Sequence, residues 1–175
     1  MSGPHRLLWF VVRVFILILV SASFWRFVAP SYTSLLAAVS DGMAPPATVM
    51  TAVDNTISVH IQGQAASATI DTMPFQAGLL LLVALIMATP GLRLKQRLAY
   101  AVLGSIIAFA VHVLSVLTVS SHMGTMSPML FLFVSLGVDL FPILIWATLS
   151  ARYWCPGRAA SRVRTGRLAR AGKRS

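Results

Sequence analysis

The stretch LAYAVLGSIIAFAVHVLSVLTV, residues 98–119, decides the fold, because it contains no Asp, Glu, Lys or Arg. A helix rises about 1.5 Å per residue, so about 20 apolar residues cross the hydrocarbon core of a bilayer. Residues 7–29, 75–89 and 128–149 are apolar over similar lengths, although residues 75–89 rely on flanking residues. We therefore predict an all-α membrane protein with four transmembrane helices.

The composition agrees with immersion in lipid. The chain of 175 residues is 57% hydrophobic and 10% charged, whereas soluble proteins average about 25% charged residues. Its net charge of +10 comes from 14 Lys and Arg against four Asp, and eight of the basic residues lie within 152–175. The composition therefore describes an apolar body followed by a basic tail.

The charges of the connecting segments predict the orientation. Arg93, Lys95 and Arg97 follow the second span, whereas residues 30–74 and 120–127 hold no Lys or Arg. Because Lys and Arg remain on the cytoplasmic side, we predict a multi-pass protein of the bacterial inner (plasma) membrane with both termini cytoplasmic.

This orientation divides the chain into four parts. They are an N-terminal signal anchor (1–29), an extracytoplasmic loop (30–74), a three-helix transmembrane bundle (75–149) and a basic cytoplasmic tail (150–175). A cleaved signal peptide is the alternative for the first part, because VSA at residues 20–22 fits the small-residue rule for cleavage sites. Arg13 interrupts the apolar region and FWRFVAP, residues 24–30, continues it, which favours the anchor.

The extracytoplasmic loop carries two patterns. Residues 31–43 predict one or two turns of amphipathic helix that end at Gly42. Residues 56–70 alternate around a turn at Gly63 and predict a β-hairpin, with His60 as a solvated side chain on its polar face. An isolated hairpin is marginally stable in water, so its apolar face needs support from its own helix, the bilayer surface or a partner protein.

Small and polar residues share one helical face in each of the last three spans. These faces are Ala77, Ala84 and Ala88; Ala101, Ser105, Ala108, His112 and Ser115; and Ser135, Asp139, Pro142 and Trp146. Small residues allow helices to approach closely. We therefore expect the three faces to point into the bundle.

Asp139, His112 and Arg13 are the candidate intramembrane polar contacts. With Asp139 near the midplane, His112 lies about 6 Å further outward and Arg13 about 6 Å further inward. Pairing of Asp139 with either residue would relieve its burial penalty. One hypothesis is a packing device that fixes helix register, and the other is a small proton- or ion-coupled transport subunit using Asp139 and His112. Packing is favoured, because no chain of further polar groups forms a conduit.

The residues that catalysis or cofactor binding requires are not visible in the sequence. Cys155 is the only cysteine, without a base nearby, and no phosphate-binding loop, metal-ligand spacing or carboxylate pair is present. We therefore predict no enzymatic activity, no metal and no cofactor. His122 is a possible extracytoplasmic site, but an enzyme using it would need a nucleophile from a partner.

The basic tail predicts binding to anionic lipid on the cytoplasmic surface. It lacks acidic residues and large apolar runs, and each Lys or Arg near such lipid contributes about 1 kcal/mol. Nucleic acid is not predicted as a partner, because no binding fold or aromatic interleaving accompanies the charge.

Three motifs carry a resemblance to a known family: FQAG at residues 75–78, HVLS at 112–115, and HMG at 122–124 before an apolar last span. Residues 74–146 resemble the C-terminal half of the exosortase and archaeosortase family, membrane cysteine enzymes that process proteins bearing a C-terminal sorting helix. Gln76 and Ala77 stand where the resemblance expects the catalytic cysteine. His112 and Ser115 stand where it expects an Asn and an Arg, and His122 loosely matches the family histidine.

The missing cysteine and arginine imply that the family's activity is not carried over. The layout of one anchor, an outer β-rich insert and three further helices resembles that of exosortase-associated membrane proteins of the exosortase H type. The resemblance implies a non-catalytic accessory protein whose partner is the exosortase-like enzyme or the helix of a sorted protein.

Overall fold

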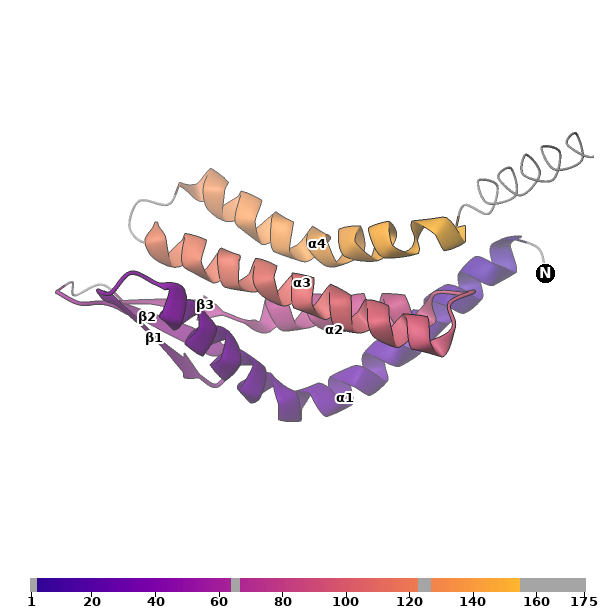
Figure 1. Ribbon diagram of the computed structural model, residues 1–175, viewed down its shortest axis with the longest axis horizontal. Helices are drawn as coiled ribbons and strands as arrows, with labels where there is room; N and C mark the ends of the chain where they lie inside the picture. The colour runs from indigo at the N-terminus through magenta and orange to yellow at the C-terminus, as the bar shows by residue number, and fades with distance from the viewer. Residues whose placement is uncertain (1–2, 64–66, 123–126, 155–175) are drawn as a thin grey trace, which may run out of the picture.

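The computed structural model describes residues 3–63, 67–122 and 127–154. The elements are α1 (Gly3–Met43), β1 (Thr48–Val53), β2 (Thr56–Ile61), β3 (Ser67–Asp71), α2 (Met73–Ala88), α3 (Leu94–Ser121) and α4 (Pro128–Trp154). The prediction of four helices with a β-insert between the first two is confirmed (Figure 1). Two of the described helices, Leu7–Met43 and Leu94–Ser121, are long and apolar enough to cross a membrane. The basic tail beyond residue 154, with Cys155, lies outside the described residues.

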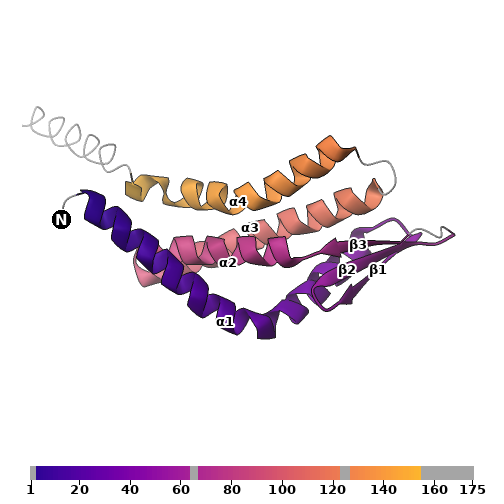
Figure 2. The ribbon, with the colours of Figure 1, turned by 180° about the vertical axis from the view of Figure 1, so that it is seen from behind.

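The molecule is elongated, with the sheet at one end. The start of α1, the turn from α2 to α3 and the end of α4 all lie at the opposite end (Figures 1 and 2). The segments that the sequence predicts to be cytoplasmic therefore share one end of the bundle, and the predicted outer insert forms the other.

The first helix is longer than the sequence predicted. It continues through residues 31–43 instead of ending at residue 29, and it contains Pro30. Proline lacks an N–H donor and clashes with the preceding turn, which accounts for a bend in α1 (Figure 2). Beyond Pro30, Tyr32, Leu36 and Ala37 are buried. The helical turns predicted for residues 31–43 are therefore confirmed as helix, but they continue α1 instead of forming a separate segment.

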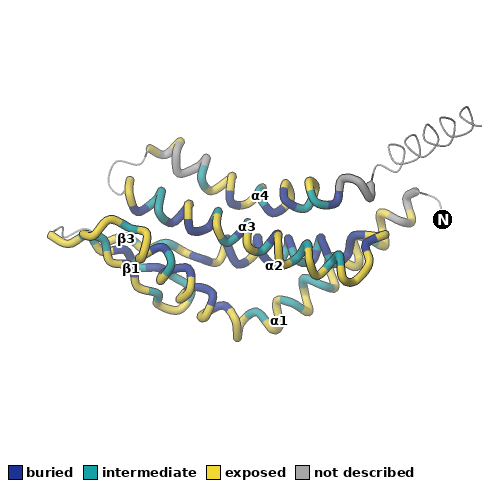
Figure 3. The backbone as a smooth tube through the Cα atoms, viewed as in Figure 1, coloured by how far each residue is buried: buried dark blue, intermediate teal, exposed yellow. Residues whose placement is uncertain are grey.

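The first half of α1 presents apolar side chains to its surroundings. Phe15, Phe24 and Phe27 are 62%, 67% and 69% exposed, and Figure 3 shows exposed positions along this half. An apolar surface of this extent is unfavourable in water, whereas acyl chains would cover it without that cost. This exposure is therefore the main structural indication that the helix lies in lipid.

The insert is a three-stranded antiparallel sheet in the order β1-β2-β3. The predicted hairpin corresponds to β2 and β3, in which Ile57 pairs with Ile70. The sequence interpretation missed β1, which a two-residue turn joins to β2. Asp54 in that turn has a φ of 52°, a left-handed conformation that suits tight hairpin turns.

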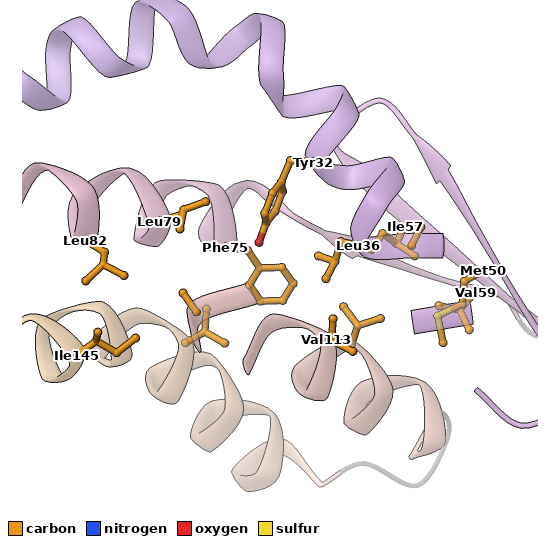
Figure 4. Close-up of a cluster of buried hydrophobic side chains, with 14 of the residues drawn as sticks. Tyr32, Leu36, Met50, Ile57, Val59, Phe75, Leu79, Leu82, Val113 and Ile145 are labelled. Carbon is orange, nitrogen blue, oxygen red and sulfur yellow. The ribbon is translucent and has the colours of Figure 1, made fainter. Parts of the chain in front are cut away.

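The apolar face of the sheet packs on the second half of α1. Met50, Ile57 and Val59 are buried in one core with Leu36 and Ala37 (Figure 4). The side chain of Asp41 also accepts a hydrogen bond of 2.7 Å from the backbone N–H of Met50. Of the three supports that the sequence allowed, the chain's own helix is the one observed.

The three remaining helices pack through glycines. A Cβ on Gly78 of α2 would lie 3.1 Å from Cγ of Pro142 in α4. A Cβ on Gly104 of α3 would lie 3.3 Å from side-chain atoms of both Leu82 and Ile86 in α2. At these two crossings, side chains of the neighbouring helix therefore pack directly on the glycine backbone. Helix α2 packs against α1, α3 and α4.

The predicted inward faces agree with the structure on α3 and only in part on α2 and α4. Ala108, His112 and Ser115 of α3 are buried, and so are Ala84 and Ala88 of α2, whereas Ala77 is exposed. On α4, Val138, Pro142 and Ile145 are buried, but Ser135 and Asp139 are exposed.

The contact between Gly78 and Pro142 explains why the buried face of α4 differs from the predicted one. It turns Pro142 and Val138 toward α2, and neighbouring residues on a helix point about 100° apart. Asp139 therefore points outward, in contrast to the predicted inward face.

The basic residue Arg97, near the start of α3, has a structural role. The guanidinium of Arg97 donates to the carbonyls of Met87 (2.7 Å) and Thr89 (3.2 Å) at the end of α2, and to that of Leu92 (3.1 Å) in the segment that follows. The indole N–H of Trp146 donates to the hydroxyl of Thr89 at 2.9 Å. A cation at a helix C-terminus also interacts favourably with the helix dipole. These contacts therefore join the C-terminal end of α2 to α3 and to α4.

Candidate functional site

The predicted site residues occupy separate places. Arg13 and Asp139 are exposed on α1 and α4, and His122 is exposed at the C-terminal cap of α3. His112 is buried. Across the described residues, neither a hydrogen bond nor an ion pair joins Asp139 to Arg13 or to His112. The transport hypothesis, which needs a path between Asp139 and His112, gains no support from this arrangement.

His112 instead contacts the first helix. Its Nδ1 shares a hydrogen bond with the hydroxyl of Tyr32, and both side chains are buried. The imidazole stacks on the ring of Phe75, with centroids 4.8 Å apart and planes 18° apart. Tyr32 packs edge-on against Phe109 at 5.9 Å. Figure 4 shows Tyr32 reaching from α1 toward Phe75 of α2.

Gln76 is the centre of a second group of polar contacts. Its Oε1 accepts a hydrogen bond of 3.0 Å from the indole N–H of Trp25. Its Nε2 donates to the hydroxyls of Thr72 (3.0 Å) and Thr33 (3.2 Å). Gln76 is 3% exposed, so these bonds form away from solvent.

The two threonines have partners of their own. The hydroxyl of Thr72 donates to the carbonyl of Asn55 at 2.6 Å, and that of Thr33 donates to the carbonyl of Ala29 at 3.1 Å. The backbone N–H of Thr72 also bonds to the carbonyl of Asn55 at 2.9 Å. One donor and two lone pairs per hydroxyl are enough for this pattern, so the group satisfies itself internally.

The two groups are contiguous, and together we name them the junction cluster. Trp25 and Tyr32 lie 5.9 Å apart between ring centroids, and Phe75 and Gln76 are neighbours on α2. The junction cluster consists of Trp25, Tyr32, Thr33, Asn55, Thr72, Phe75, Gln76, Phe109 and His112. Its members come from α1, the turn between β1 and β2, the start of α2, and α3. It therefore joins the sheet to the helix bundle.

Sequence reasoning found His112 but missed the rest of the junction cluster. Tyr32 and Thr33 lay in a segment predicted to be outside the bundle. Gln76 had a usable signal, because it is the only amide in the apolar helix Met73–Ala88. A buried amide requires partners, and this one could have been predicted to mark a contact between elements.

The arrangement favours a structural role over catalysis. The hydroxyls of Thr33 and Thr72 donate to backbone carbonyls, so neither is hydrogen-bonded to a base that would activate it. Within residues 3–63, 67–122 and 127–154, no group of three His, Cys, Asp or Glu lies close enough to hold a metal ion. What the junction cluster can do is fix three helices and a sheet relative to one another.

Comparisons with protein-family models, with curated proteins and with solved structures found no match to this chain.

Proposed function

We propose that the protein is a four-span protein of the bacterial inner membrane with both termini in the cytoplasm and the sheet outside. The exposed apolar half of α1 and the length of α3 support membrane insertion. Arg93 and Lys95 are exposed at the end opposite the sheet, and the tail adds more basic residues beyond α4. Basic residues collected at one end agree with a cytoplasmic location of that end.

Within this membrane, its proposed role is that of a non-catalytic accessory protein of an exosortase-type sorting system. The observation that supports this proposal best is that the amide of Gln76 is buried and hydrogen-bonded. It stands where the resemblance expects the nucleophilic cysteine, and both ends of its amide are held by buried hydrogen bonds. Ser115, at the expected arginine, bonds to the carbonyl of Val111 at 2.9 Å. Gln76 and Ser115 therefore make structural contacts where the family has catalytic residues. The function that we propose is binding instead of catalysis.

The partner would be the sorting enzyme or the transmembrane helix of its substrate. Apolar side chains exposed along α1, α3 and α4 offer lateral surfaces for such a helix, among them Leu19, Ile106 and Leu144. Helices in lipid associate through close packing and interhelical hydrogen bonds, and neither requires a catalytic group. The basic tail remains a predicted contact for anionic lipid.

Affinity purification from mild detergent tests the proposal. The tagged full-length chain should retain a membrane protein with the cysteine, arginine and histidine of the exosortase family, or a protein with a C-terminal sorting helix. A chain carrying the overpacking substitution Gly104→Leu, which should disrupt the bundle, serves as the matched control and should retain neither. Recovery of the unaltered chain without any membrane protein would contradict the proposal.

A further inference from the structure

Two opposite charges lie exposed on apolar helices of the bundle. Arg13 is exposed on α1 between exposed apolar residues such as Val12 and Ile16. Asp139 is exposed on α4 beside Leu136 and Leu140, which are 50% and 54% exposed. In the described part of the chain, neither charge has a hydrogen bond or an ion pair. If the chain spans the membrane as proposed above, both face lipid, where an unpaired charge is unfavourable.

The two charges border the same side of the molecule. The rings of Phe10 and Trp146 stack with centroids 5.8 Å apart, which brings the cytoplasmic ends of α1 and α4 together. Arg13 follows Phe10 by about one helical turn, and Asp139 precedes Trp146 by about two turns. Residues separated by whole turns share a helix face, so each charge lies near the face that carries its ring.

The charges also lie at similar depths. Both are displaced from the stacked rings toward the sheet, Arg13 by about 4.5 Å and Asp139 by about 10 Å at the helical rise per residue. The difference of about 6 Å is within the reach of a flexible arginine side chain. Within one chain, however, α1 diverges from α4 as it leaves the stacked rings (Figures 1 and 2). This divergence explains why Arg13 and Asp139 of the same chain are not paired.

We propose that two copies of the chain associate in the membrane, with Arg13 of each copy paired with Asp139 of the other. A two-fold axis along the membrane normal keeps equivalent residues at equal depth and forms both pairs at once. Trp9 and Ile16 beside Arg13, and Leu136 and Ile143 beside Asp139, are exposed and would supply the apolar contact around the pairs. A different partner helix carrying a single cation would neutralise Asp139 and leave Arg13 unpaired, so the charges favour a second copy.

Charge reversal in separate copies tests this pairing. Full-length Asp139→Arg and Arg13→Asp chains carry different tags and are examined in lipid bilayers by fluorescence energy transfer. Each variant alone places like charges at both contacts, so its self-association should be at least about tenfold weaker than that of the unaltered chain. A mixture of the two variants places Arg opposite Asp at both contacts. Association between the two variants should therefore return to the level of the unaltered chain.

Several outcomes would overturn the pairing. Failure of the mixture to restore association would do so, because pairing within a chain or with another partner helix predicts no restoration. A monomeric unaltered chain at the same protein-to-lipid ratio would do so as well. If charge reversal prevents insertion, Asp139→Asn and Arg13→Gln replace it, and association should weaken in both. Unchanged association in both neutral variants would contradict the pairing.

The inference rests on the proposed membrane insertion but can fail separately from the accessory role. A monomer that retains a sorting-system partner in affinity purification overturns the pairing and supports the proposed function. A pair restored by mixing, purified without any such partner, supports the pairing and contradicts the proposed function.

Discussion

Replacement of Gln76 by Leu is expected to lower the free energy of unfolding by about 2–4 kcal/mol. The substitution removes the acceptor for the indole N–H of Trp25 and the donor to the hydroxyls of Thr33 and Thr72. A buried polar group left without its partner costs about 1–3 kcal/mol, and more than one group is affected here. Unfolding in mild detergent, followed by tryptophan fluorescence and by far-ultraviolet circular dichroism, measures the change.

The matched control is Gln62→Leu. Gln62 is exposed in the turn after β2, so its substitution should change stability by no more than about 0.5 kcal/mol. Equal effects of the two substitutions would contradict the structural importance of the junction cluster.

The substitution Gly104→Leu is expected to destabilise the bundle by about 3 kcal/mol or more. A Cβ at this position already lies within 3.3 Å of Leu82 and Ile86 and 3.5 Å from Ile145, so a leucine has no space between α2, α3 and α4. Helices α2 and α4 would have to move away from α3, with loss of buried contacts. The midpoint of thermal unfolding in detergent, read by circular dichroism, should fall accordingly.

The matched control is Gly137→Leu, a substitution of the same kind at an exposed glycine of α4. Gly137 is exposed, and a Cβ there would meet no atom within 4 Å. Because leucine is a better helix former than glycine, this variant should be unchanged or more stable by about 0.5–1 kcal/mol. A loss of stability as large as that of Gly104→Leu would show that packing at the glycine crossing is not the cause.

The sequence predicted the elements whose patterns are local. Apolar length identified the helices, and strict alternation identified the pair of strands β2 and β3. Strand β1 escaped detection because Val49 and Val53 on its outer side are as apolar as Met50 and Ala52 on the inner side. Without a difference between the two faces, no period of two is visible.

The features that the sequence could not predict depend on contacts between distant segments. The continuation of α1 beyond Pro30 relies on packing of Tyr32 and Leu36 against α2, α3 and the sheet. The contact of Pro142 with Gly78 determines which face of α4 is buried, and the periodicity of α4 alone does not predict this contact. The candidate site follows the same rule. His112 could be recognised on a helix face of small residues, whereas its partner Tyr32 lay in a segment predicted to be outside the bundle.

In the proposed orientation, the helices cross a bilayer with the sheet on the outer side. Single-cysteine labelling in intact cells tests it most directly, in a chain with Cys155→Ser. A cysteine replacing Thr51, exposed on β1, should react with a membrane-impermeant thiol reagent added outside. A cysteine replacing Lys95, exposed at the start of α3, should react only after the membrane is permeabilised. Labelling of position 95 in intact cells, or equal labelling of both positions, would contradict this orientation.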